Sequence, residues 1–290
     1  MADLILGTVQ FGLDYGINNT HGKIVQSEVK KILSFAYENN ITMLDTASAY
    51  GDSETVLGNS ICEVDKPFSI ITKYPSNQSV CPLQWIDNSL QSLKVERIYS
   101  YLFHNYSTFQ EHPEYIEDFL QIKKSGKAEK IGFSLYYPSE AKYIVTNNIP
   151  CDIVQVPYNI FDQRFAAVFS ILKSKNIEIH VRSVFLQGLF FMSAENIDMH
   201  FFPIKDNLTE ISRFAKISNL DISSVCFGYV NMNKHIDKIV IGVDTLENLI
   251  SNINSFRIVN EGKIDFSSLE ELSVTDEMII LPFNWNLKKL

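Results

Sequence analysis

The sequence MLDTASAYGDSE, from Met43 to Glu54, changes abruptly from apolar to polar. Met43 and Leu44 are typical of a buried strand, and this strand stops at Asp45. Polar side chains follow at once, with Tyr50 among them. An unbroken apolar run indicates a strand that is covered on both faces, as in a parallel sheet. The stretch therefore predicts a parallel strand whose carboxyl end carries an acid and, in the loop after it, a tyrosine.

Short apolar runs of this kind recur along the chain, and stretches with helical periodicity separate them. In the first of these stretches, apolar residues recur at helical spacing from Val29 to Tyr37, just before Asn39 and Asn40. Similar stretches are 85–93, 115–122, 165–172 and 246–253. The apolar runs are 4–7, 42–45, 69–73, 99–104, 130–134, 152–157, 178–182 and 238–242.

Eight strand and helix alternations in 290 residues predict an α/β fold, a closed (β/α)8 TIM barrel. An open doubly wound sheet is the alternative, but the Rossmann fingerprint G-x-G-x-x-G is absent from GTVQFG after the first strand. No linker divides the chain, so we expect a single domain over 1–290, with 255–290 as a C-terminal extension beside the barrel mouth. The long connection 187–237 should contain two helices.

The composition argues against several classes of protein. Hydrophobic residues make up 46% and charged residues 20%, as in ordinary soluble proteins. A net charge of -9 lacks the footprint of nucleic-acid or anionic-membrane binding. The sequence shows neither a signal peptide nor a membrane span, so we expect a cytoplasmic protein. Its four cysteines are widely spaced and predict neither a zinc site nor a disulfide framework.

Polar side chains end three consecutive strands, at the end where such barrels place their chemistry. Asp45, Lys73 and His104 end the second, third and fourth strands. Each has an ordinary structural explanation when taken alone, but with Tyr50 they predict an acid-base centre for a carbonyl and alcohol pair. We expect the charge of Lys73 to lower the pKa of Tyr50, and Asp45 to hold Lys73 in place. His104 would hydrogen-bond a substrate oxygen.

At these residues the sequence resembles the aldo-keto reductases, and the resemblance extends from about 6 to 252. Its most specific parts are LDTASAYGDSE, ITK at 71–73 and LFHN at 102–105. The resemblance implies a (β/α)8 barrel and reversible hydride transfer between a nicotinamide cofactor, NADPH or NADH, and a small-molecule carbonyl substrate. Tyr50 would be the proton donor. The family's catalytic tetrad falls on Asp45, Tyr50, Lys73 and His104.

The resemblance also implies where the cofactor binds. Ser134 and Gln155 match residues that hold the nicotinamide amide, although Leu135 stands where the family has asparagine. Arg182 stands where many members have an aromatic residue that stacks on nicotinamide, and a planar guanidinium can stack too. The complete set of implied cofactor-binding residues is Gly7, Thr8, Ser134, Gln155, Arg182, Ser183, Phe185, Gln187, Gly188, Gly242, Asp244, Asn248 and Asn252.

The cofactor preference stays open in the sequence. Gly242, Asp244 and Asn248 stand where members that prefer NADPH often have lysine or arginine. Without those cations a 2′-phosphate loses much of its expected binding energy, so NADH or mixed use is credible. A basic residue from elsewhere in the chain would change this, and the candidates are Lys234, Lys238 and Arg257.

Two alternative functions are kept. One is a non-catalytic regulatory subunit on the same fold, which binds the nucleotide and a partner protein. The other is a barrel hydrolase or isomerase with paired carboxylates or a metal held by Asp45, His104 and His180. The sequence has no H-x-H or H-E-x-x-H pattern, and we predict no metal site.

The loops expected to set substrate specificity contain several aromatic and few basic residues, which would suit a neutral aldehyde, ketone or sugar. These loops are 15–23, 74–81, 106–113 and 190–203. The sequence gives no indication of the oligomeric state.

Overall fold

Eight parallel strands close into a barrel in the computed structural model, which describes residues 2–76, 80–262 and 264–285. The strands are β1 (Asp3–Gly7), β2 (Met43–Asp45), β3 (Ser69–Tyr74), β4 (Ile98–Phe103), β5 (Ala128–Ser134), β6 (Ile153–Pro157), β7 (Glu178–Arg182) and β8 (Lys238–Ile241). They pair in chain order, and β8 returns to β1 by pairing Leu6 with Ile241. The predicted (β/α)8 barrel is confirmed, and the open-sheet alternative is wrong.

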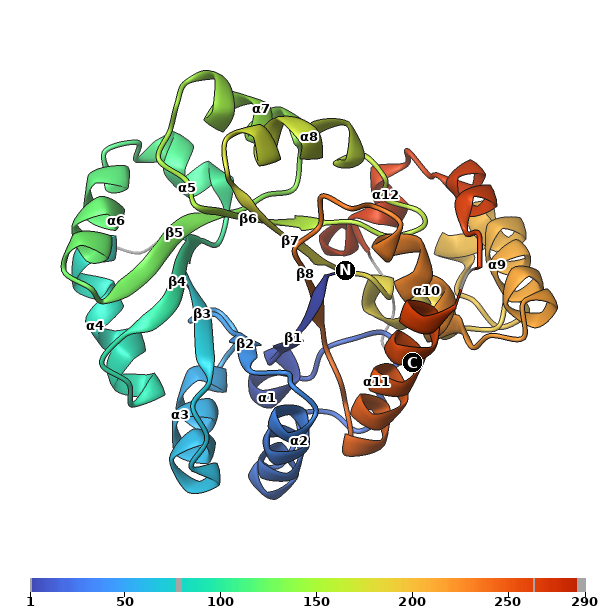
Figure 1. Ribbon diagram of the computed structural model, residues 1–290, viewed down its shortest axis with the longest axis horizontal. Helices are drawn as coiled ribbons and strands as arrows, with labels where there is room; N and C mark the ends of the chain where they lie inside the picture. The colour runs from blue at the N-terminus through green and yellow to red at the C-terminus, as the bar shows by residue number, and fades with distance from the viewer. Residues whose placement is uncertain (1, 77–79, 263, 286–290) are drawn as a thin grey trace.

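Helices form a ring outside these strands, and Figure 1 shows the barrel end-on inside that ring. None of the helices within the described ranges is long and apolar enough to span a membrane. The α-helices are α1 (Val9–Gly12), α2 (Gln26–Glu38), α3 (Ser53–Val64), α4 (Pro82–Leu93), α5 (Tyr106–Glu111), α6 (Tyr115–Lys124), α7 (Pro138–Thr146), α8 (Ala166–Ser174), α9 (Lys205–Ile217), α10 (Ile222–Asn231), α11 (Leu246–Glu261) and α12 (Glu277–Ile280). The 3-10 helices are η1 (Leu186–Phe191), η2 (Met199–Ile204), η3 (Ser267–Leu272) and η4 (Pro282–Asn284).

The ends of the strands lie within two residues of the predicted ones, and α9 and α10 are the two helices expected between the seventh and eighth strands. Several elements differ from the sequence-based expectation. Helix α5 occupies part of the predicted loop 106–113, and η1 and η2 occupy parts of the predicted loop 190–203. Helix α11 continues past residue 255 to Glu261. The buried face of α11 includes Asn252 and Ser255, so polar residues interrupt the apolar pattern that would have marked its length. The extension after α11 consists of η3, α12 and η4.

The inner faces of the strands have an apolar layer with a polar layer above it. Side chains alternate between the two faces of a strand, so every second residue points into the barrel. The buried apolar residues of the interior are Ile5, Ile71, Leu102 and Ile153, with Met43 packed against them. The residues two positions further along the same rows are Gly7, Lys73, His104, Gln155 and Asp45. The period of the strands therefore brings the predicted catalytic residues together at the carboxyl end of the barrel.

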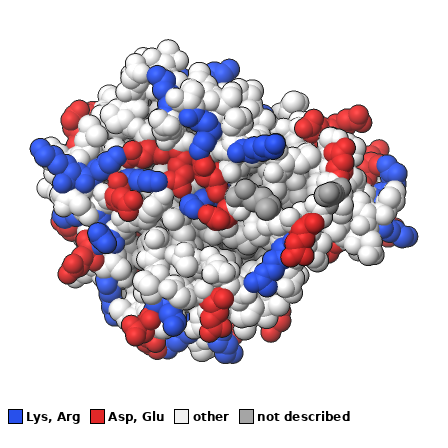
Figure 2. Space-filling model, in the orientation of Figure 1, with Lys and Arg blue, Asp and Glu red and all other residues white. Residues whose placement is uncertain are grey.

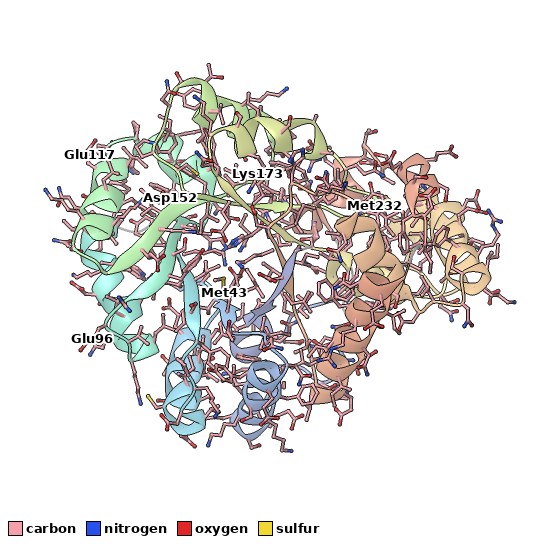
Figure 3. The ribbon with its side chains drawn as sticks, in the orientation of Figure 1. Met43, Glu96, Glu117, Asp152, Lys173 and Met232 are labelled. Atoms are coloured by element: carbon pink, nitrogen blue, oxygen red, sulfur yellow. The ribbon has the colours of Figure 1, made fainter. Side chains whose placement is uncertain are left out.

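The amino-terminal end of the barrel carries paired charges. Figure 2 shows acidic and basic side chains side by side near the centre of one face, and Figure 3 labels Asp152 and Lys173 there. Lys123 binds Asp152 at 2.7 Å, and Lys173 binds Asp237 at 2.8 Å. The hollow at this end is also lined by Asp3, Lys130, Glu178, Lys234 and Lys238. These groups lie at the end of the strands opposite to the polar layer.

Candidate active site

A cavity of about 690 Å³ opens at the carboxyl ends of the strands. All thirteen residues that the sequence assigns to the cofactor line this cavity. They come from the ends of β1, β5, β6, β7 and β8, from the segment after β7, and from α11. Asp45, Tyr50 and His104 line it as well, and Lys73 lies buried beneath them. The structure therefore brings all the predicted site residues to one place.

Lys73 and Asp45 form an ion pair at the base of the cavity. The ammonium lies 2.9 and 2.8 Å from the two carboxylate oxygens and donates a third hydrogen bond, of 2.8 Å, to the carbonyl of Thr46. The side chains are 1% and 4% exposed, so water does not compete for these bonds. Gln155 donates to the same carboxylate at 2.7 Å. The pair is held in one geometry because both charges have their hydrogen-bonding groups satisfied.

Two glycines place the loop that carries Tyr50. A Cβ atom on Gly12 would lie 1.8 Å from the carbonyl oxygen of Tyr50, so α1 packs directly against the backbone of this loop. Gly51 has φ of +60°, and a Cβ there would meet the carbonyl of Gly12 at 2.6 Å. Close backbone contact thus fixes the tyrosine above the ion pair, with the Lys73 ammonium 5.1 Å from the centre of its ring.

The pKa of Tyr50 shifts in the direction opposite to the sequence-based expectation. Burial raises it well above its ordinary value, the Asp45 carboxylate raises it further, and the charge of Arg182 acts the other way. The expected lowering of this pKa by Lys73 is wrong for this state, because burial is the largest cause of the shift and it raises the pKa. The Lys73 ammonium donates its hydrogen bonds to Asp45 and Thr46. Burial also lowers the pKa of Lys73 against the opposing effect of Asp45. Tyr50 consequently holds its proton at neutral pH.

His104 lies edge-on to Tyr50, with ring centroids 5.6 Å apart and an interplanar angle of 83°. Burial lowers the pKa of His104 to about 3, and the positive charges of Lys73 and Arg182 contribute to this shift. The imidazole is therefore neutral at pH 7. A neutral ring has one donor and one acceptor nitrogen, so it can hold an oxygen beside the tyrosine.

Arg182 lies on the side of the cavity next to these residues. Its guanidinium stands 4.2 Å from the centre of the Tyr136 ring and donates to the carbonyl of Leu135 at 3.2 Å. The aromatic partner of this arginine is thus a protein side chain, and the Leu135 side chain, at the position of the family's asparagine, is buried in the core. Ser134 is buried at the end of β5 and contributes to the cavity wall.

The loop after β1 crosses the cavity and contacts the segment after β7. The Gln187 amide donates to the Tyr15 hydroxyl at 2.9 Å, and Ile17 donates its N–H to the Gln187 carbonyl at 3.2 Å. Ser183, Leu186, Gln187 and Gly188 have positive φ values between 44° and 94°. Such left-handed residues turn the chain sharply, and here they fold the segment over the cavity.

None of the three distant basic residues supplies a cation to the β8 and α11 side of the cavity. Lys234 and Lys238 line the hollow at the opposite end of the barrel. Arg257 donates to Asn39 beyond the middle of α11. The side of the cavity formed by Gly242, Asp244 and Asn248 therefore lacks the basic residues that the sequence left open as candidates.

Several residues of the cavity wall were not predicted from the sequence. Tyr136 follows Ser134 by two residues and Gln10 stands in GTVQFG, so closeness to predicted site residues is the signal that could have identified both. Pro282 and Phe283 come from the extension, where no sequence pattern predicted a contact with the cavity. The remaining unpredicted lining residues are Val9, Tyr15, Gly16, Asn18, Asn19, Val184, Phe191, Ser223, Val240, Val243 and Ser251, of which Tyr15 to Asn19 lie in a loop proposed for specificity.

The three residues considered as metal ligands do not come together, because Asp45 and His104 line the cavity and His180 does not. Within the described part of the chain, no group of three or more His, Cys, Asp or Glu side chains is arranged to hold a metal ion. His180 is buried, and its Nε2 lies 2.8 Å from Glu178, two residues earlier on the same strand. This contact accounts for Nε2, while the buried Nδ1 has no hydrogen-bond partner among the described residues.

The chain is therefore a (β/α)8 barrel with a buried Lys73 and Asp45 pair beneath Tyr50 and His104. The model of the Aldo/keto reductase family matches residues 3–273. The chain therefore belongs to the aldo-keto reductase family of oxidoreductases.

Individual relatives agree with this assignment. The protein named uncharacterized oxidoreductase YqkF, from Bacillus subtilis (strain 168), is 23% identical over 265 residues, which are 81% of this chain and 85% of the relative. A putative aldo-keto reductase from Pseudomonas aeruginosa has a TM-score of 0.68 at 21% identity, covering 89% of this chain and 90% of that one. Aldo-keto reductase AKR11C1 from Bacillus halodurans has a TM-score of 0.73 at 17% identity, covering 93% and 90%. At these identities the two solved structures support the fold alone.

Proposed function

We propose that the protein is an NAD(P)H-dependent reductase that converts the carbonyl group of a small aldehyde, ketone or keto sugar to an alcohol, with Tyr50 as the proton donor. The observation that carries this proposal is the buried Lys73 and Asp45 pair directly beneath Tyr50, with neutral His104 at its edge. This arrangement offers one proton donor and one neutral hydrogen-bonding ring at the same point of the cavity.

The residues of the cavity fit a nicotinamide cofactor. The cavity is large enough for an extended ligand, and its wall contains a buried acceptor, Gln10 Oε1, that has no hydrogen-bond partner among the described residues. When bound, the cofactor supplies the hydride. Ser134, Gln155 and Arg182 would hold its nicotinamide end near Tyr50, and the folded segment around Gly188 would cover its middle.

In the proposed reaction, the side chains of the protein transfer the proton and stabilise the developing charge. Tyr50 stays protonated because its environment disfavours the phenolate, so it meets the carbonyl oxygen as a hydrogen-bond donor. As negative charge develops on that oxygen, the oxygen becomes a much stronger base than a phenolate and takes the proton. His104 holds the same oxygen from the side. Lys73 and Asp45 do not transfer the proton in this scheme, and they fix the position and field around the tyrosine.

The first experiment is a titration with NADH and NADPH, followed by cofactor oxidation assays with aldehydes, ketones and nucleotide-linked keto sugars. Tyr50→Phe should lower kcat by at least about 100-fold in a chemistry-limited assay, because general acid catalysis is lost. Its nucleotide Kd should stay within about twofold of the wild type. Tyr99→Phe is the matched control, since Tyr99 lies at the other end of the barrel beside Lys130 and Glu178.

The outcomes separate the alternatives. Wild-type turnover by Tyr50→Phe would refute the assignment of the proton donor. A protein that binds nucleotide and reduces no carbonyl in the panel would be a regulatory subunit of this fold. Activity that depends on a metal and is lost in EDTA would favour the hydrolase or isomerase.

A further inference from the structure

We propose that this protein selects NADH over NADPH, and that Asp244 is the residue that excludes the 2′-phosphate. This inference rests on the proposed function. Since the reacting end of the cofactor must lie at Tyr50 and His104, the adenosine half extends toward the other end of the same cavity. That end is formed by Gln10, Gly242, Asp244 and the first turns of α11.

Two acceptor groups line this end of the cavity, the Asp244 carboxylate and the Gln10 amide oxygen. Asp244 is half-buried in the wall and receives a hydrogen bond from the Gln10 side chain. Since the Gln10 amide nitrogen is the atom that donates, its oxygen is the atom left over, and this buried oxygen has no partner among the described residues. A carboxylate and an amide oxygen need donors. Ribose hydroxyls provide donors, and a phosphate dianion provides none.

The backbone at the start of α11 is already bound to an acid. A helix N-terminus with free N–H groups is a natural place for a phosphate. Here Glu28 of α2 accepts the N–H of Leu246 at 3.3 Å, and the Thr245 hydroxyl accepts the N–H of Asn248 at 3.1 Å. The negative charge that suits this helix end is therefore supplied by Glu28, which also binds the exposed Lys31 at 3.1 Å.

The charges and the space around Asp244 agree with exclusion of a phosphate. Burial raises the pKa of Asp244, and the neighbouring Asp14 and His21 side chains act on it in opposite directions. A Cβ on Gly242 would lie 2.8 Å from the Gln10 amide nitrogen, so a side chain at this position would displace the Gln10 amide. A 2′-phosphate at this end would face the Asp244 carboxylate without a dedicated cation, and like charges in contact oppose binding.

The test measures equilibrium binding by the whole protein. Titration calorimetry with NADH, NADPH, 5′-AMP and adenosine 2′,5′-bisphosphate reports affinity without turnover. The wild type should bind NADH and 5′-AMP at least about tenfold more tightly than their 2′-phosphorylated counterparts. Asp244→Asn should narrow this ratio by about tenfold, and Asn248→Arg, which adds a cation on the cavity wall, should narrow it as well. Glu247→Gln is the matched control, because it removes an exposed acid of the same helix turn outside the cavity.

The possible results test the cofactor inference and the proposed reductase function separately. Equal or tighter binding of the 2′-phosphorylated ligands by the wild type would overturn the inference and leave the reductase proposal intact. An unchanged ratio in Asp244→Asn, or an equal change in Glu247→Gln, would show that Asp244 does not select the cofactor. A protein that binds none of the four ligands would overturn the proposed function itself.

Discussion

At the scale of single residues, His104 makes the stability of the protein depend on pH. Its pKa falls from an ordinary value of 6.5 to about 3 in the folded chain. Between these two values the unfolded chain binds the additional proton. The contribution of His104 to the stability of the folded state is therefore fully present above pH 6.5. This contribution is lost as the pH falls toward 3.

We expect His104→Gln to reduce this pH dependence. Replacing the histidine removes a group that takes up about one proton on unfolding, which corresponds to at most about 1.4 kcal/mol per pH unit. Urea unfolding of both proteins at several pH values between 4 and 7 measures the two slopes. The wild type should lose more stability on acidification than the variant, and parallel curves would show that His104 titrates normally in the folded protein.

At the same scale, the clustering of the predicted site residues could be inferred from the sequence, but their interactions could not. Asp45, Lys73 and His104 end their strands, and the two-residue period of a strand is sufficient to place them together. The direction of the Tyr50 pKa shift depends on how deeply the phenol is buried and on its closeness to Asp45, which the sequence does not specify. Glu28 was missed for a similar reason: it lies on α2, and only the packing of α2 against α11 brings it to Leu246.

At the scale of elements, the packing of α1 against the loop after β2 is required for catalysis under the proposed function. Gly12→Ala would place a methyl group within 1.8 Å of the Tyr50 carbonyl oxygen and 2.6 Å of the Ser53 nitrogen. Because backbone atoms cannot rotate aside, α1 or the loop must shift. A displacement of about 1 Å at a reacting group lowers turnover by about 100-fold, so kcat/KM should fall by about that factor.

Gly126→Ala is the control for this prediction. Gly126 also sits at a tight turn, with φ of +79°, but a Cβ there meets nothing within 4 Å. The substitution should therefore cost about 1 kcal/mol of stability through backbone strain and leave turnover close to that of the wild type. Steady-state kinetics and urea unfolding of both variants provide the comparison. Equal turnover in the two variants would show that contact with α1 does not position Tyr50.

The elements themselves were predictable to different degrees. The strands are unbroken apolar runs because helices cover their outer faces and the barrel interior their inner faces, so their pattern is strong. The turns before β2, β6 and β7 were marked by asparagines that take left-handed conformations at Asn40, Asn148 and Asn176. The end of α11 was not predictable, because some of the buried positions of this helix are polar. Asn252 is one of them, and it accepts a hydrogen bond from Ser223 of α10.

At the scale of the whole molecule, the last part of the described chain returns to the mouth of the barrel. Ile279, Ile280 and Leu281 are buried, and they anchor the segment that follows. Pro282 and Phe283 then line the cavity, where the Phe283 ring meets Tyr136 edge-on at 5.0 Å. Tyr136 in turn stacks on Arg182, so the extension reaches the neighbourhood of the proposed reaction centre through two side-chain contacts.

This arrangement predicts that Phe283 contributes to substrate binding and little to folding. The side chain is 59% exposed, so Phe283→Ala should change the free energy of unfolding by less than about 0.5 kcal/mol. Loss of its apolar surface at the mouth should raise KM for the carbonyl substrate by about three- to tenfold, because part of the wall that excludes water is removed. Phe202→Ala is the matched control, since Phe202 is 57% exposed on η2 and does not line the cavity. If both variants have the same KM, the extension covers the barrel without contacting the substrate.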